Sequence, residues 1–102
     1  MINNVQDATI VYEKDLITGK KITEFTNLEY VHIKLGSNCN MEKHSLPMNV
    51  DFFVISGSGN IHVDDEIYKI NKDDLIRVKK GSLRALFTKE NEELTVLVIK
   101  NL

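Results

Sequence analysis

The side chain with the clearest chemical potential in this sequence is His44. A histidine imidazole titrates near neutral pH, so His44 has the chemistry of a general base. No partner for it is visible in the sequence, which favours a structural or ligand-orienting role over catalysis. The other two histidines, His32 and His62, alternate with apolar neighbours, and we expect both to face solvent.

Sulfur-containing and acidic residues offer little further chemistry. Cys39 lies in the polar loop 36–40 without a basic neighbour to activate its thiol, so we do not expect a nucleophile there. Met41 and Met48 are typical of core filling rather than of a copper site. The acidic run 64–66 lacks the spacing of an EF-hand and is typical of a hairpin turn.

Short β-rich segments separated by turn residues must position these groups. The clearest segment, 30–35, alternates strictly and places Val31, Ile33 and Leu35 on one face, which is typical of a half-buried strand. No window of about eleven residues or more shows a helical stripe. Further strands are expected at 9–12, 22–25, 50–56, 60–63, 67–70, 75–78, 83–88 and 94–99.

Glycine-containing turns connect these strands. Thr18 and Gly19 are predicted to form one turn, and the chain is expected to reverse sharply at 57–59, where two glycines provide the backbone freedom. Regularly spaced strands with tight turns favour a sandwich or barrel over a parallel sheet. The sequence therefore predicts an all-β protein.

The composition is that of one small globular domain. The 102 residues are 42% hydrophobic and 27% charged, which is enough for a single modest core. The net charge of -2 leaves no broad basic stripe for nucleic acid. The longest apolar run, 94–99, is far shorter than the roughly 20 residues of a membrane helix. With one cysteine and no signal-peptide pattern, we expect a soluble cytoplasmic protein that binds neither nucleic acid nor membrane.

Residues 44–59 carry a motif-like pattern, in which His44 precedes an apolar strand and a Gly-x-Gly turn. This stretch resembles the first motif of the cupin superfamily: His-x-His, three or four residues, Glu, six residues and Gly. Residues 73–84 resemble the second motif, and 60–68 resemble the hairpin between the two. The resemblance implies a cupin-like jelly-roll β-barrel, also called a double-stranded β-helix. The implied organisation is one domain, 1–102, with N-terminal strands in 1–27 and the barrel in 28–100.

Metal-binding cupins hold one divalent ion with two histidines and a glutamate of the first motif and a histidine of the second. Counting back from Gly57 places His44 and Leu46 on the two histidines and Val50 on the glutamate, while Arg84 falls on the last histidine. A single donor cannot hold a transition metal, and a guanidinium would repel it. We therefore predict no metal and no other cofactor.

Two other alignments recover a second ligand. A longer spacing places Asp51 on the glutamate, and anchoring on Gly36 pairs Glu42 with His44. Either alignment would support a metal-dependent enzyme of isomerase or dioxygenase type that uses His44 with Glu42 or Asp51. A transition-metal site normally needs three or four protein ligands, so two would bind weakly.

Without a metal, the inward face of the barrel predicts a ligand pocket. Strand alternation places Phe52 and Val54 on the same side as Val50, and Leu86 on the same side as Arg84. An apolar cleft with few polar groups is the usual form of a ligand site. The expected ligand-binding residues of the barrel interior are His44, Arg84, Leu46, Val50, Phe52 and Leu86.

Arg84 separates the hypotheses about function. Its planar donor fork suits carboxylate or phosphate, so the leading hypothesis is a metal-free cupin that binds a small anionic or sugar-like molecule. Alternatively, Arg84 turns to the barrel mouth and pairs with Glu42, Asp51 or another acid, because a buried unpaired charge is costly. A purely structural or regulatory domain is a third hypothesis, and the sequence leaves catalysis open.

Apolar residues also point away from the predicted interior. Phe53 and Ile55 fall on the face opposite Phe52 and need cover. The N-terminal strand 9–12 could supply it, from the same chain or from a partner. Small cupins commonly pair through such sheets, so the resemblance implies a homodimer.

Overall fold

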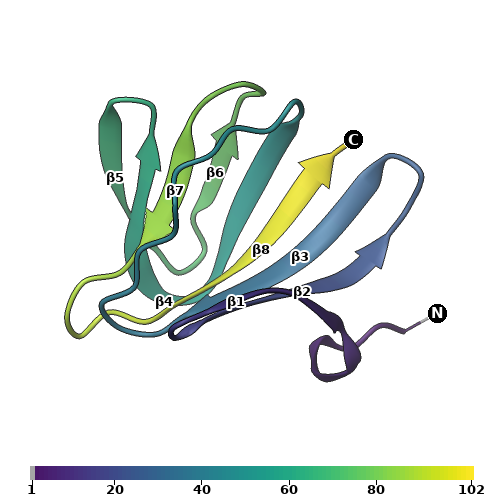
Figure 1. Cartoon of the computed structure of the whole chain (residues 1–102), viewed down its shortest axis with the longest axis horizontal. Coiled ribbons are helices and arrows are strands. Elements are labelled where there is room, and N and C mark those ends of the chain that lie inside the picture. Colours follow the sequence, from purple (N-terminus) through teal and green to yellow (C-terminus); the bar gives the residue numbers. More distant parts are fainter. Residues whose placement is uncertain (1) are drawn as a thin grey trace.

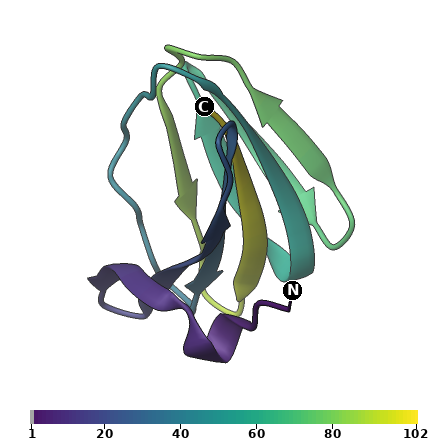
Figure 2. The ribbon, with the colours of Figure 1, turned by 90° about the vertical axis from the view of Figure 1, so that its right-hand side faces the viewer.

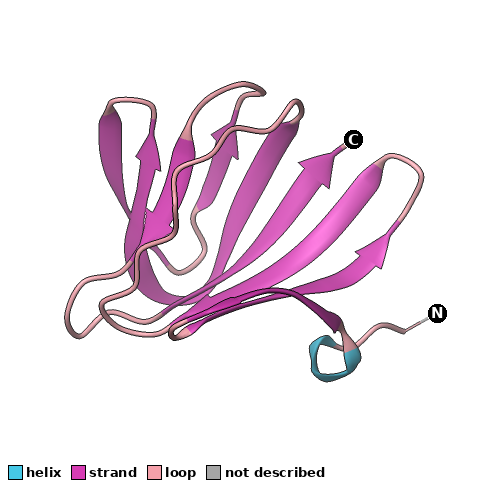
Figure 3. Cartoon of the chain, in the orientation of Figure 1, coloured by secondary structure: helices cyan, strands magenta, loops and turns pink. Residues whose placement is uncertain are grey.

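Eight strands and one turn of 3-10 helix shape residues 2–102, the part of the chain that the computed structural model describes (Figures 1 and 3). The helix, η1 (Val5–Asp7), precedes the first strand, and no helix in this part is long and apolar enough to cross a membrane. The strand content confirms the all-β prediction. The strands are β1 (Thr9–Lys14), β2 (Ile17–Glu24), β3 (Leu28–Leu35), β4 (Asn49–Val63), β5 (Glu66–Asn71), β6 (Leu75–Val78), β7 (Arg84–Phe87) and β8 (Leu94–Asn101).

Two antiparallel sheets share strand β4 and face each other as two layers (Figure 2). The larger sheet runs β1-β2-β3-β8-β4-β6, and the smaller one runs β5-β4-β7. Strands that are distant in sequence, such as β3 and β8, thus lie side by side (Figure 1). The N-terminal strands β1 and β2 extend the larger sheet beyond β3.

The central strand β4 passes from one sheet to the other without reversing. Its pairing with β8 shifts register between Val54 and Ser56, and its second half continues as the partner of β5. Gly57 has a φ of 77°, and a Cβ there would overlap the carbonyl oxygen of Glu93. The sharp reversal predicted at 57–59 is therefore wrong. Glycine here permits a bend and a close approach within one strand, a use that the sequence does not distinguish from a turn.

The first hairpin also differs from its prediction. Thr18 and Gly19 lie inside β2, so the turn predicted there is wrong. The chain reverses instead around Asp15, which adopts a φ of 53°. A Cβ on Gly19 would lie 3.2 Å from the Cβ of Tyr12 on β1, so this glycine allows two strands to approach closely.

The core fills the space between the two sheets. Val54 and Val96 of the larger sheet and Ile61 of the smaller one are fully buried in a single apolar cluster. Burying each such side chain stabilises the fold by about 1.5–3 kcal/mol. Alternation along β4 leaves Phe53 and Ile55 outside, 36% and 39% exposed. Strand β1 does not cover them, because it pairs with β2 at the far edge of the same sheet.

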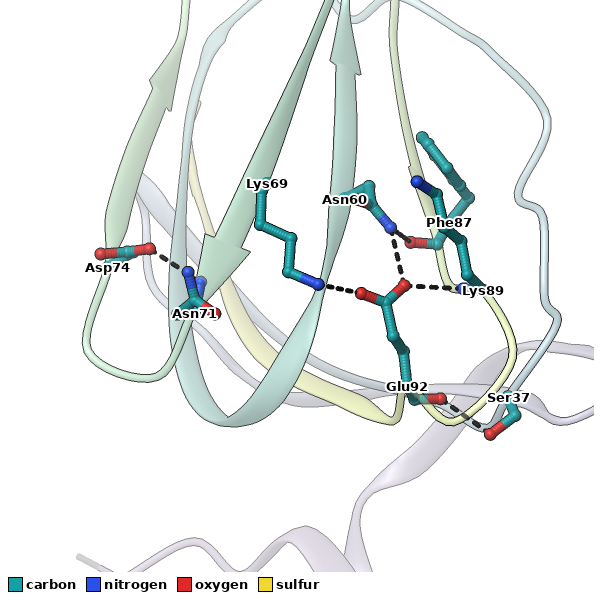
Figure 4. A network of polar contacts seen from close by, with 8 residues as sticks. All are labelled: Ser37, Asn60, Lys69, Asn71, Asp74, Phe87, Lys89 and Glu92. Carbon is teal, nitrogen blue, oxygen red and sulfur yellow. Dashed lines mark hydrogen bonds and ion pairs between the residues drawn. The ribbon is translucent and has the colours of Figure 1, made fainter.

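A buried carboxylate fixes the loop between β7 and β8 (Figure 4). Glu92 accepts hydrogen bonds from Asn60 Nδ2 at 2.9 Å and from the Lys89 backbone N–H at 2.8 Å, and it pairs with the Lys69 ammonium. The backbone carbonyl oxygen of Glu92 accepts a hydrogen bond from the Ser37 hydroxyl at 2.9 Å. The pairing with Lys69, followed by the Lys89 N–H, holds the pKa of Glu92 down at about 2. The network joins β4, β5 and the segment after β3.

Candidate functional site

A cavity of about 480 Å³ opens between the two sheets. Its walls come from the inner face of the larger sheet, from β7 and from residues 41–44, which run beside β7. Four of its lining side chains are cationic and only two are carboxylates, so the cavity carries an excess of positive charge. The lining residues are Val11, Tyr12, Gly19, Lys21, Glu29, Val31, Ile33, Met41, Glu42, Lys43, His44, Phe52, Arg84, Ala85, Leu86, Val98 and Lys100.

Arg84 is the most unusual group in this cavity. It is only 3% exposed, and its Nε and Nη1 atoms are buried without a hydrogen-bond partner. The guanidinium carbon lies 5.9 Å from the centre of the Phe52 ring, within the range of a cation–π contact. Burial lowers the pKa of Arg84, although a guanidinium stays charged at any working pH. Among the described residues, no carboxylate pairs with it, so the structure does not support the alternative in which Arg84 turns to the barrel mouth and pairs with an acid.

Residues 41–44 hold Arg84 in place through the backbone. The His44 N–H donates to the Arg84 carbonyl at 3.1 Å, and the Arg84 N–H donates to the His44 carbonyl at 3.0 Å. The Met41 N–H donates to the Leu86 carbonyl at 3.0 Å. These residues therefore extend the smaller sheet beyond β7 and bring the exposed His44 ring to the cavity wall.

The structure places four of the six predicted ligand-binding residues around the cavity: His44, Phe52, Arg84 and Leu86. Leu46 and Val50 do not line it. Val50 is completely buried in the apolar core, and Leu46 packs against that core. Alternation identifies an inward-facing side chain, but it does not show whether neighbouring side chains already fill the space in front of it.

A charged cluster on the opposite wall was not predicted. The Glu29 carboxylate lies 3.2 Å from the Lys21 ammonium and 3.1 Å from the Lys100 ammonium. Burial raises the pKa of Glu29, but hydrogen bonds to Lys100 and Lys21 outweigh burial and lower it overall. A signal was present in the sequence, because Glu29 continues the inward alternation of Val31.

The cupin metal positions carry side chains that do not suit a cation. Leu46 and Val50 are apolar, and the last position holds the Arg84 guanidinium with its two unpartnered nitrogens. Within residues 2–102, no group of three or more His, Cys, Asp or Glu side chains is arranged to hold a metal ion. The residues present therefore do not fit the metal that the cupin resemblance implies.

Asp51 cannot join His44 as a second donor. It receives hydrogen bonds from Arg77 Nε at 2.7 Å and Nη2 at 2.8 Å, and both residues lie on the outer face of the larger sheet. That pairing lowers the pKa of Asp51. Glu42 does line the cavity, but its side chain is 87% exposed and lies 3.8 Å from the Lys14 ammonium. His44 and Glu42 therefore make at most two donors.

The remaining candidates from the sequence lie elsewhere. Cys39 is buried, and its thiol lies 3.6 Å from the Ser37 carbonyl. His62 packs on the ring of Phe87 at a centroid distance of 4.8 Å. His32 is half-buried on the outer face, where burial and then the nearby lysines lower its pKa. None of these three candidates lines the cavity.

Solved structures from several bacteria share this architecture at low sequence identity. A cupin superfamily protein from Desulfitobacterium hafniense aligns with a TM-score of 0.78 and 12% identity over 91% of this chain and 84% of its own. KdgF from Halomonas sp. aligns with a TM-score of 0.84 and 12% identity over 100% of this chain and 94% of its own. The polyketide cyclase RemF from Streptomyces resistomycificus aligns with a TM-score of 0.85 and 13% identity over 96% of this chain and 76% of its own.

Sequence comparison adds no relative. No protein-family model matches the sequence, and no curated protein matches it significantly. At identities this low, structural similarity defines the fold and not the activity. The predicted jelly-roll barrel is confirmed, and this chain has the cupin fold.

Proposed function

We propose that this protein binds a small molecule with a carboxylate group and an apolar body in the cavity between its sheets. The observation that carries the proposal is Arg84, a buried guanidinium with two donor atoms that no protein group satisfies. Buried polar atoms in native proteins are nearly always hydrogen-bonded, and a buried unpaired charge is costly. A bound anion would pair this charge.

A carboxylate matches the chemistry of the site. Its two oxygens can accept parallel hydrogen bonds from one guanidinium, which is the strongest common form of carboxylate recognition. Beside Arg84, the Phe52 ring and the Leu86 and Val98 side chains supply an apolar surface for the rest of the ligand. This combination of an apolar wall with one convergent charged group is typical of small-molecule sites.

A metal-dependent isomerase or dioxygenase is the second candidate, and it has less support. His44 and Glu42 offer two donors, and the nearby guanidinium disfavours a cation. Elemental analysis of protein purified without added metal tests this candidate directly. Stoichiometric iron, manganese, nickel or zinc would favour it over the anion site.

Thermal-shift titration with matched six-carbon ligands tests the proposal. We expect hexanoate to raise the melting temperature of the wild type and hexanol to leave it unchanged, because only the acid can satisfy Arg84. Arg84→Gln should abolish the shift. Arg77→Gln, which removes the outward-facing arginine that pairs with Asp51, should retain it. The proposal fails if hexanoate gives no shift, or if Arg84→Gln responds like the wild type.

A further inference from the structure

The wall opposite Arg84 carries a second positive site. One carboxylate, Glu29, lies between the two ammonium groups of Lys21 and Lys100 at 3.2 and 3.1 Å. Lys21 also pairs with Glu24 at 2.8 Å, so Lys21 is bound by two carboxylates, whereas Lys100 shares the single carboxylate of Glu29 with Lys21. The Lys100 and Glu29 side chains are only 27% and 17% exposed, and both line the cavity.

Lys100 keeps hydrogen-bonding capacity for a ligand. An ammonium group has three N–H donors. In the described part of the chain, the Lys21 ammonium also bonds Glu24 at 2.8 Å, whereas the only hydrogen-bond or ion-pair partner of the Lys100 ammonium is Glu29. Two N–H groups of Lys100 are thus available at the cavity wall.

The two cationic sites are one short molecule apart. Val98 faces Phe52 across the β4–β8 pair, and Lys100 follows Val98 on the inner face of β8. Diagonal neighbours of this kind are about 7–8 Å apart, so Lys100 begins close to the ring that lies under the Arg84 guanidinium. The Val98 side chain provides an apolar surface between the two sites.

We infer that the ligand is a short dicarboxylate. One carboxylate would bind Arg84, the other would bind Lys100, and the carbon chain between them would lie along Val98 and Val31. Arg84, which has no carboxylate partner, and Lys100, which has N–H groups to spare, offer two separate anchors for two carboxylates. This inference rests on the proposed function and narrows its ligand class.

Calorimetric titration with adipate and hexanoate tests the second anchor, because the two acids have the same six-carbon chain and differ in one carboxylate. A charge-assisted hydrogen bond in a half-buried site corresponds to about tenfold in affinity. We expect adipate to bind the wild type at least about tenfold more tightly than hexanoate. Lys100→Met should reduce the affinity for adipate to that for hexanoate and leave hexanoate binding unchanged.

Lys34→Met, which removes an exposed lysine from the outer face of β3, is the matched control and should preserve the preference for adipate. Equal binding of the two acids by the wild type would overturn the inference while leaving the Arg84 site intact. The inference is also overturned, with the Arg84 site left intact, if Lys100→Met weakens the binding of adipate and of hexanoate by the same factor. Failure of both acids to bind would instead overturn the proposed function. If Lys100→Met does not fold, the comparison of the two acids on the wild type decides alone.

Discussion

At the scale of single residues, the molecule keeps a charge in its interior without a protein partner. Arg84 lies against Phe52 and is held by backbone bonds to His44, so its position is fixed even though its donor atoms are unsatisfied. Such a group lowers the stability of the ligand-free protein, and under the proposed function it provides binding energy when an anion binds. Function and stability thus make opposite demands on this position.

Replacement of Arg84 by methionine should therefore stabilise the ligand-free protein. We expect Arg84→Met to raise the free energy of unfolding by about 1–3 kcal/mol, because a flexible apolar side chain replaces an unpaired buried charge. Urea denaturation measures this change as a shift of the unfolding midpoint, provided that the dependence of the free energy of unfolding on urea concentration is the same for both proteins. Arg77→Met removes only an exposed ion pair with Asp51 and should lower stability by at most about 1 kcal/mol. Destabilisation by Arg84→Met would show that the contact with Phe52 outweighs the cost of burial.

The sequence predicted the site correctly where strand alternation alone determines the direction of a side chain. It failed where the packing of neighbouring side chains or the pairing of distant strands determines what lines the cavity. Phe52 and Leu86 follow from alternation alone, and both line the cavity. Val50 faces inward as alternation predicts, yet side chains from both sheets fill the space around it. Lys100 lies next to Glu29 only because β3 and β8 pair, and sequence alone does not give that pairing.

At the scale of elements, the loop between β7 and β8 depends on the Glu92 network (Figure 4). The loop connects the strand that carries Arg84 to the strand that carries Lys100. Its carboxylate is ionised in the folded protein down to about pH 2, well below its ordinary pKa of 4.5. Folding is therefore linked to the ionisation of one buried acid.

Stability should fall in acid because of this linkage. A carboxyl group whose pKa is depressed by folding contributes its full stabilisation above the unfolded pKa and loses it as pH falls from about 5 to about 2. We expect Glu92 to account for about 1–2 kcal/mol of that loss, limited because Lys69 is half exposed. Urea denaturation at several pH values should show a shallower acid dependence for Glu92→Gln. Glu90→Gln, an exposed change in the same loop, should follow the wild type; identical curves for both variants would contradict the assignment.

The strands themselves were largely predictable, and the turns were less so. The strict alternation around Val31 identified β3, because a half-buried strand imposes that period. The glycines at 57–59 were assigned to a turn, although β4 continues through them. Glycine marks a need for backbone freedom or close packing, and only the partner strands show which need applies.

At the scale of the whole molecule, one apolar surface has no cover within the described chain. We define the outer apolar face as Phe53 and Ile55 on β4, Leu75 on β6, and Leu97 and Ile99 on β8. Phe53 pairs directly with Leu97 on one side and Leu75 on the other, so the surface is continuous across three strands. We propose that the outer apolar face pairs with the same face of a second copy of this chain. The cytoplasmic location expected from the sequence also stays a prediction.

A charge placed in the outer apolar face should separate the two copies. We expect Phe53→Lys to weaken self-association by about tenfold or more, because a central aromatic contact is lost and an ammonium is buried. Sedimentation velocity across a micromolar dilution series measures this change. Ile67→Lys, at an exposed apolar position on the smaller sheet, should leave association unchanged. A wild type that is monomeric throughout the series would contradict the proposal.

The continuity of β4 has a consequence for how the protein unfolds. This strand of 15 residues forms hydrogen bonds with β5, β6, β7 and β8, so both sheets depend on it. Loss of β4 would therefore remove the central strand of both sheets. We therefore expect local opening to begin at edge strands such as β1, and the amides of β4 to exchange with solvent mainly when the whole domain opens. The bend at Gly57 thus makes two layers into a single cooperative folding unit.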